Sequence, residues 1–139
     1  MSSKLNPYIN FSDNAKEAME FYTTVFGGKL TMSTFKEGGM PHDPSQDDKL
    51  IMHAMLIADN GMTLMAADTP KGWPYNPGNN VSLSLSGDDE AELQGYWDKL
   101  SAGAKIGQPL TKAPWGDTFG MLTDKFGMRW MVNIAGKRS

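Results

Sequence analysis

HAMLIADNGMTLMA (residues 53–66) and FGMLTDKFGMRWMV (residues 119–132) are two similar stretches of one chain, and together they decide the fold. They align at a constant offset of 66 residues, so that Gly61 falls on Gly127. In each stretch apolar residues alternate on both sides of a short turn, which predicts two strands joined by that turn. Two copies of one supersecondary unit explain the similarity.

The repeat extends upstream into another strand. NPYINF (residues 6–11) aligns with NVSLSL (residues 80–85) at an offset of 74, which places Asn6 on Asn80. In the second stretch apolar residues alternate strictly with serines, the pattern of a strand with one apolar and one polar face. The first copy is roughly ten residues longer than the second, and residues 36–48 are the predicted insertion.

A helix follows the first strand of each copy. Asn14 with Glu17, and Asp89 with Glu92, have the spacing of a capping box. Apolar residues then recur at helical spacing, which predicts core-facing stripes made of Ala18, Tyr22, Val25 and Phe26 in one copy and Leu93, Trp97 and Leu100 in the other.

The composition excludes several classes of function. Apolar residues at 40% and charged residues at 21% are typical of a soluble globular protein. The net charge of -3, without a run of Lys or Arg, argues against nucleic acid or an acidic membrane as a partner. Without cysteines, thiolate catalysis and disulfides are excluded. No stretch approaches the ~18 apolar residues of a membrane span or forms a signal core, so we expect a cytoplasmic protein.

The repeated pattern resembles a known superfamily. The stretches that carry the resemblance are NPYINF, residues 53–68 and residues 115–134. They resemble the vicinal oxygen chelate superfamily (glyoxalase I, extradiol dioxygenases, bleomycin and fosfomycin resistance proteins), and within it the PhnB-like proteins. Some PhnB-like proteins are labelled ubiquinone methyltransferases, a function we reject here because no glycine-rich strand-to-helix turn suits a methyl-donor nucleoside.

The resemblance implies an α+β fold in which two βαβββ modules with curled mixed sheets form a cavity. We therefore expect one glyoxalase-like domain over residues 1–139, made of a first module at 4–68, a linker at 69–79 and a second module at 80–135.

Strand alternation predicts which side chains line this cavity. Because the helix of each module packs outside its sheet in relatives of this fold, apolar residues should lie under the helices: Ile9, Phe11, Leu56, Leu64, Val81, Leu83, Leu85, Leu122 and Trp130. The opposite face carries amides, hydroxyls, methionines and aromatics. These predicted ligand-binding residues are Asn6, Tyr8, Asn10, Met55, Met65, Asn80, Ser82, Ser84, Trp115, Phe119, Met121, Met131 and Asn133. The alternative is that the serines face bulk water.

The resemblance also implies positions for a metal. Metal enzymes of the superfamily typically hold a divalent ion with His or Glu from the first and fourth strands of each module. The aligned residues here are Asn6, Met65, Asn80 and Met131. Amides are weak donors and thioethers prefer soft ions, so we expect no metal at this site and no other cofactor. His42, in a loop with Asp43, Asp47 and Asp48, is an alternative weak cation site, although a solvated acidic loop explains it more simply.

His53 is the candidate catalytic residue because it is predicted to face the cavity and its repeat partner is Phe119. An imidazole with its pKa near ~6.5 can act as an acid or a base at neutral pH. A histidine held by neighbouring groups is the structural alternative. Asp68 would support a catalytic role only within hydrogen-bond reach of His53. Arg129, on the same face as Met131, is either an anion partner or an exposed charge.

The function expected from the sequence is binding of a small organic molecule in the cavity between the modules, without the superfamily's metal. The resemblance to bleomycin resistance proteins, which sequester a ligand without a metal, implies a homodimer. The first alternative is a lyase, isomerase or dioxygenase-type enzyme that uses His53 or a displaced metal site. The second is an interaction domain whose cavity is filled by some of the eleven methionines. Trp73 and Tyr75 should fold over the cavity mouth or contact a partner.

Overall fold

Residues 1–77 form the first of two compact units and follow the predicted order of strand, helix and three strands. The structure is a computed structural model that describes residues 3–39 and 44–136. The elements of unit 1 are β1 (Tyr8–Phe11), α1 (Ala15–Phe26), β2 (Lys29–Thr34), α2 (Phe35–Gly38), β3 (Ile51–Ile57) and β4 (Thr63–Asp68). The short helix α2 overlaps the start of the predicted insertion at 36–48.

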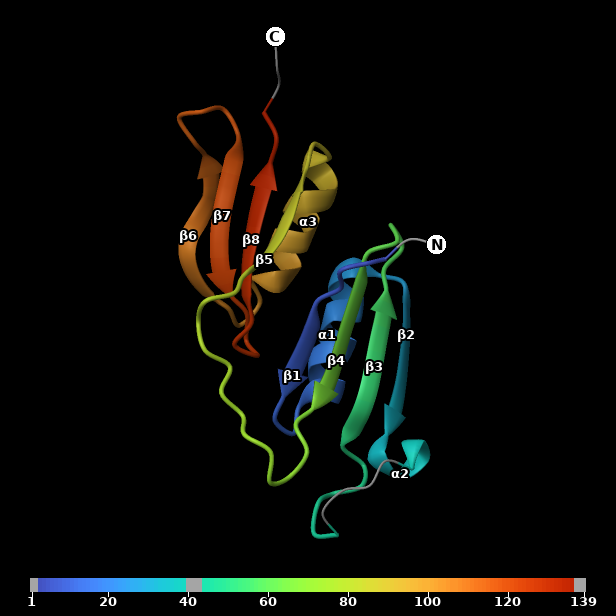
Figure 1. The fold of residues 1–139 in the computed structure, drawn as a ribbon. Coiled ribbons are helices and arrows are strands. Elements are labelled where there is room, and N and C mark those ends of the chain that lie inside the picture. Colours follow the sequence, from blue (N-terminus) through green and yellow to red (C-terminus); the bar gives the residue numbers. More distant parts are fainter. Residues whose placement is uncertain (1–2, 40–43, 137–139) are drawn as a thin grey trace. The chain divides into compact units, whose positions relative to one another are not determined.

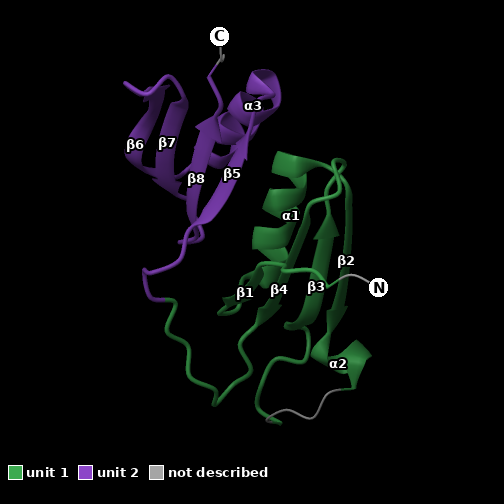
Figure 2. Cartoon of the chain, turned by 45° about the horizontal axis from the view of Figure 1, so that its top comes forward, with its two compact units in different colours: residues 1–77 green, residues 78–139 purple. Residues whose placement is uncertain are grey.

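Residues 78–139 form unit 2 (Figure 2). Its elements are β5 (Leu83–Gly87), α3 (Glu90–Leu100), β6 (Lys105–Lys112), β7 (Thr118–Thr123) and β8 (Arg129–Ile134). Over the residues described, no helix is long and apolar enough to cross a membrane.

The two units have the same mixed-sheet topology (Figure 1). Sheet A has the strand order β1-β4-β3-β2, and sheet B has the order β5-β8-β7-β6. The first strand of each unit pairs in parallel with the last, and the other pairs are antiparallel. The predicted α+β class is confirmed.

One face of each sheet packs on a helix. Helix α1 contacts β2, β3 and β4, while α3 contacts β5 and β8. Leu56 is 1% exposed and its repeat partner Leu122 is 3% exposed. Apolar burial is the main favourable contribution to folding. The other buried residues that the alternation predicts for these faces are Phe11, Leu64, Leu85 and Trp130.

Helix capping differs from the prediction in unit 1. Asn14 is the N-cap residue of α1, but its side chain makes no capping hydrogen bond. The Oδ1 atom of Asp68 instead accepts from the N–H of Ala15 at 2.9 Å. In unit 2 the Asp89 side chain accepts from the N–H of Glu92, which is one of the two hydrogen bonds of the predicted capping box.

The predicted alignment of the first strands is wrong by two residues. Tyr8 pairs with Met65, and Ser84 pairs with Met131, so Ser84 is the counterpart of Tyr8. A shift of two residues keeps a period-two pattern in phase, and alternation therefore could not reveal the error. Val81 is also a wrong prediction: it precedes β5 and is 61% exposed instead of lying under α3.

Candidate functional site

The face of sheet A opposite α1, here called open face A, carries most of the predicted site residues of unit 1. Tyr8 pairs with Met65, Met65 with Met55, and Met55 with Thr31. These side chains therefore form one row across all four strands, because paired residues point to the same side of a sheet. Further residues of this face are Asn10, His53 and Ser33.

Tyr8 and His53 are in direct contact on open face A. The Tyr8 hydroxyl lies 3.4 Å from His53 Nδ1, and the ring centroids are 5.9 Å apart. Partial burial raises the pKa of Tyr8 above 10.0, so its hydroxyl is protonated at neutral pH. When the Tyr8 hydroxyl donates to Nδ1 of neutral His53, the imidazole proton is on Nε2. The Tyr8–His53 pair is therefore a polar group next to Met55 and Met65.

The corresponding open face B lies opposite α3 in unit 2. Ser84, Met131, Met121 and Gln108 are in register across its strands. The next row of paired residues consists of Ser86, Asn133, Phe119 and Thr111. The predicted inward residues that lie in the strands of unit 2 therefore share one face, on which Phe119 is the counterpart of His53 and Ser84 the counterpart of Tyr8.

Asp68 does not support His53. Its Oδ2 atom accepts from the N–H of Ile51 at 2.9 Å, and its Oδ1 atom accepts from the N–H of Ala15. Asp68 is 2% exposed and belongs to the face covered by α1. Its carboxylate holds the start of a helix and of a strand together, which is a structural role.

Asp117 has a comparable structural role in unit 2. Its Oδ1 atom accepts from the N–H of Gly136 at 2.8 Å, and its Oδ2 atom accepts from Asn133 Nδ2 at 3.1 Å. The side-chain amide of Asn133 is therefore partly used within the unit. This interaction reduces the capacity of Asn133 to bind a ligand.

Other predicted site residues lie outside the strands. Asn6 precedes β1, while Asn80 and Ser82 precede β5. Trp115 is 64% exposed in the turn between β6 and β7. Arg129 is on open face B, where its guanidinium donates to the carbonyl of Asn79. His42 and Asp43 lie outside the described residues.

The positions expected for the superfamily's metal do not offer typical ligands. In strand register the neighbour of Met65 is Tyr8 and the neighbour of Met131 is Ser84, so each unit offers one thioether beside one hydroxyl. The described residues contain no group of three His, Asp or Glu side chains that could hold a metal ion. Thioether and hydroxyl groups are not the donors that first-row divalent ions prefer in proteins.

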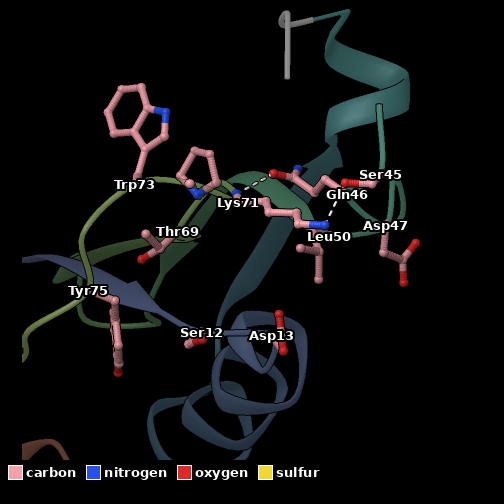
Figure 3. A pocket seen from close by; sticks show the side chains of 12 residues that line it. Ser12, Asp13, Ser45, Gln46, Asp47, Leu50, Thr69, Lys71, Trp73 and Tyr75 are labelled. Carbon is pink, nitrogen blue, oxygen red and sulfur yellow. Dashed lines mark hydrogen bonds between the residues drawn. The ribbon is translucent and has the colours of Figure 1, made fainter. Parts of the chain in front are cut away.

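Unit 1 also contains a pocket of about 360 Å³ that the sequence did not predict (Figure 3). It lies where β1 and β4 end and β3 begins, and none of the four residues in the Tyr8–Met65–Met55–Thr31 row lines it. Trp73 and Tyr75, which were predicted to cover the cavity mouth or contact a partner, line this pocket. Two sequence signals lay near it: the linker at 69–79, which is rich in Pro and Gly, and the acidic loop that includes Asp47.

Comparison with known proteins identifies the family. Residues 4–132 match the model of the Glyoxalase/Bleomycin resistance protein/Dioxygenase superfamily. The match spans most of the chain and agrees with the two βαβββ units, so the chain belongs to this superfamily.

The chain is also similar to three individual proteins. Protein YjdN of Escherichia coli (strain K12) is 28% identical over 141 residues, which cover 94% of each chain. Protein PA1353 from Pseudomonas aeruginosa is 36% identical, with a TM-score of 0.84 and coverage of 98% of this chain and 100% of that chain. A PhnB protein from Bacillus cereus, named as a 3-demethylubiquinone-9 3-methyltransferase, is 26% identical, with a TM-score of 0.75 and coverage of 96% and 100%.

Proposed function

We propose that this chain binds a small organic molecule on open face A of unit 1, with the Tyr8–His53 pair as the main polar contact. The observation that carries the proposal is the 3.4 Å contact between Tyr8 and His53 beside Met55 and Met65. Flexible, polarizable thioethers fit irregular apolar groups, while the phenol and the imidazole bind a polar group. The proposed ligand is therefore mostly apolar, with one or two hydrogen-bonding groups.

Calorimetric titration with phenol, benzamide and benzoate tests this proposal. Each probe combines one apolar ring with one polar group, and the three differ in charge and donor capacity. We expect at least one probe to bind wild-type protein and to bind His53→Phe about tenfold more weakly, a loss of about 1.4 kcal/mol. Tyr75→Phe is the control, because Tyr75 lies outside open face A. Equal binding to wild type and His53→Phe would contradict the proposal.

Acid–base catalysis at His53 is the second candidate function. The contact with Tyr8 favours it, because a phenol that fixes one imidazole nitrogen orients the other for proton transfer. In this function a bound molecule is converted, whereas a binding protein returns it unchanged. Proton NMR spectra of each probe that binds, taken before and after incubation, distinguish the two outcomes.

We further propose that binding requires no resident metal. The donor set at the superfamily's positions supports this, since Met65 and Met131 offer thioethers. Elemental analysis of protein purified without chelators should give far less than one first-row divalent ion per chain. A near-stoichiometric ion would overturn the proposal and point to another ligand set.

A homodimer and a cytoplasmic location complete the proposal. The resemblance to metal-free resistance proteins supports the dimer, and the composition supports the location. Light scattering coupled to gel filtration should give about twice the monomer mass of 15.3 kDa. A mass equal to the monomer across the concentrations of the binding experiment would exclude the dimer.

A further inference from the structure

The pocket at the end of sheet A is separate from the proposed site. It is formed by three segments of unit 1: the loop after β1, the loop before β3 and the chain after β4. Its volume of about 360 Å³ is within the range of small-molecule sites. A ligand in this pocket would lie beside Ser12, Asp13, Thr69, Lys71, Trp73 and Tyr75.

Hydrogen bonds between two of these segments hold one wall of the pocket. Gln46 is 7% exposed, and its Oε1 atom accepts from the backbone N–H of Lys71 at 2.6 Å. The ammonium of Lys71 donates to the Ser45 hydroxyl at 2.5 Å. These bonds, drawn in Figure 3, fix the path of the chain after β4 and the direction of the Lys71 side chain.

The lining carries charges of both signs. Lys71 supplies an ammonium group, while Asp13 and Asp47 supply carboxylates. Asp47 Oδ1 already accepts from the N–H of Lys49, so Asp13 is the carboxylate with the clearer capacity for a ligand. A ligand with only one charge would be repelled by one of these groups, whereas a zwitterion complements both.

Two aromatic side chains complete the lining. Trp73 is 63% exposed and Tyr75 is 44% exposed, and both belong to the segment that the Gln46 bond anchors. In Figure 3 they lie on the opposite side of the view from Ser45 and Asp47. Exposed aromatic rings gain free energy when a ligand covers them. They therefore favour an apolar group on the ligand.

We propose that this pocket binds a free α-amino acid with an apolar side chain. The ligand's carboxylate contacts the Lys71 ammonium, its ammonium contacts the Asp13 carboxylate, and its side chain contacts Trp73 and Tyr75. This site is additional to open face A and does not depend on the function proposed there.

Three probes on the wild-type protein test the charge requirement. L-Phenylalanine has both charges, 2-phenylethylamine has only the ammonium, and 3-phenylpropionate has only the carboxylate. In ¹H–¹⁵N NMR spectra with each probe up to about 20 mM, we expect L-phenylalanine to shift the Lys71, Gly72 and Trp73 amides saturably. Each singly charged probe should bind at least about tenfold more weakly. No saturable shift with L-phenylalanine, or equal shifts with all three probes, would overturn the proposal.

Two variants then test the residues. Asp13→Asn removes the charge and tolerates the backbone φ of 73° that Asp13 adopts, since Asn is among the residues most often found there. Lys71→Met removes the ammonium but keeps an unbranched side chain. Each should weaken L-phenylalanine binding about tenfold, whereas Asp88→Asn and Lys112→Met, exposed controls in unit 2, should not. Affinities equal to the controls would reject the assigned contacts.

Discussion

Units 1 and 2 share their helix-covered faces but differ on their open faces. Leu56 and Leu122 occupy the same position under the helices, and both are nearly inaccessible. On the open faces the methionine pair Met55–Met65 corresponds to Met121–Met131. The polar groups beside these pairs do not correspond, since Ser84 and Phe119 of unit 2 occupy the positions equivalent to Tyr8 and His53 of unit 1.

This difference indicates which parts of the repeat serve the fold. A residue that must fill space under a helix has few alternatives, because buried volume is costly to change. The open faces tolerate substitutions that alter chemistry. Unit 1 therefore carries the imidazole and phenol that the proposed function requires, on a scaffold that unit 2 shares.

The largest expected effect is the loss of stability caused by substitutions on the helix-covered faces. Leu56→Ala and Leu122→Ala should each destabilise their own unit by about 3 kcal/mol, because each leaves a cavity under a helix. Met55→Ala and Met121→Ala, on the open faces, should cost less than about 1 kcal/mol. Urea unfolding gives these free energies. Equal losses for the leucine and methionine variants would show that the faces are assigned wrongly.

The second prediction concerns the buried carboxylates. Asp68→Ala should cost about 2–3 kcal/mol, because two backbone N–H groups lose their acceptor. Asp117→Ala should cost less, about 1–2 kcal/mol, since one of its donors is a side-chain amide that can reorient.

Hydrogen exchange gives a local check on the same variants. In Asp68→Ala, the amides of Ala15 and Ile51 should exchange faster than in wild type, while amides of unit 2 keep their rates. Unchanged protection at these two amides would remove the structural role assigned to Asp68.

The third prediction uses a glycine under α3. A Cβ atom at Gly120 would lie 2.7 Å from the Trp97 ring and 2.9 Å from Leu110 Cα. Gly120→Ala should therefore destabilise unit 2 by about 2 kcal/mol through overpacking. Ala54→Gly at the equivalent position of unit 1 should cost about 1 kcal/mol. A neutral Gly120→Ala variant in urea unfolding would contradict the close packing of Trp97.

The smallest effect is the contribution of Tyr8 to the pH dependence of stability. Because burial raises its pKa in the folded state, its contribution to stability is present below the unfolded pKa of about 10 and is lost as the pH rises through the higher folded pKa. Between about pH 8 and pH 11, wild type should therefore lose slightly more stability than Tyr8→Phe. Urea midpoints of both proteins at both pH values measure the difference, and equal losses would argue against it.

The sequence predicted the repeat, the element order and the face of most strand residues, because hydrophobic alternation reports which side of a strand is buried. Leu56 and Trp130 are correctly predicted examples. The prediction from sequence failed at Asn14. This residue has the spacing of a capping motif, but the carboxylate of Asp68, which is distant in the sequence, accepts the hydrogen bond at the helix N-terminus. Such a contact depends on tertiary structure, which local spacing does not encode.

For the site, the sequence predicted that Tyr8 and His53 share a face but not that they touch. A distance between strands that are not adjacent in the sheet depends on twist and side-chain rotamers, neither of which a sequence pattern specifies. The pocket around Lys71 was missed for a similar reason. It is assembled from three loops, and loops have no periodicity from which contacts can be inferred.

The most direct test of the account is ¹³C-methyl NMR of the methionines during titration with phenol, benzamide and benzoate. The account predicts that a binding probe shifts the Met55 and Met65 methyl signals in wild type, and that these shifts are strongly reduced in His53→Phe. The Met19 signal should stay constant, because Met19 belongs to α1 and is fully buried. Probes that bind but leave the Met55 and Met65 signals unchanged would contradict the proposed site.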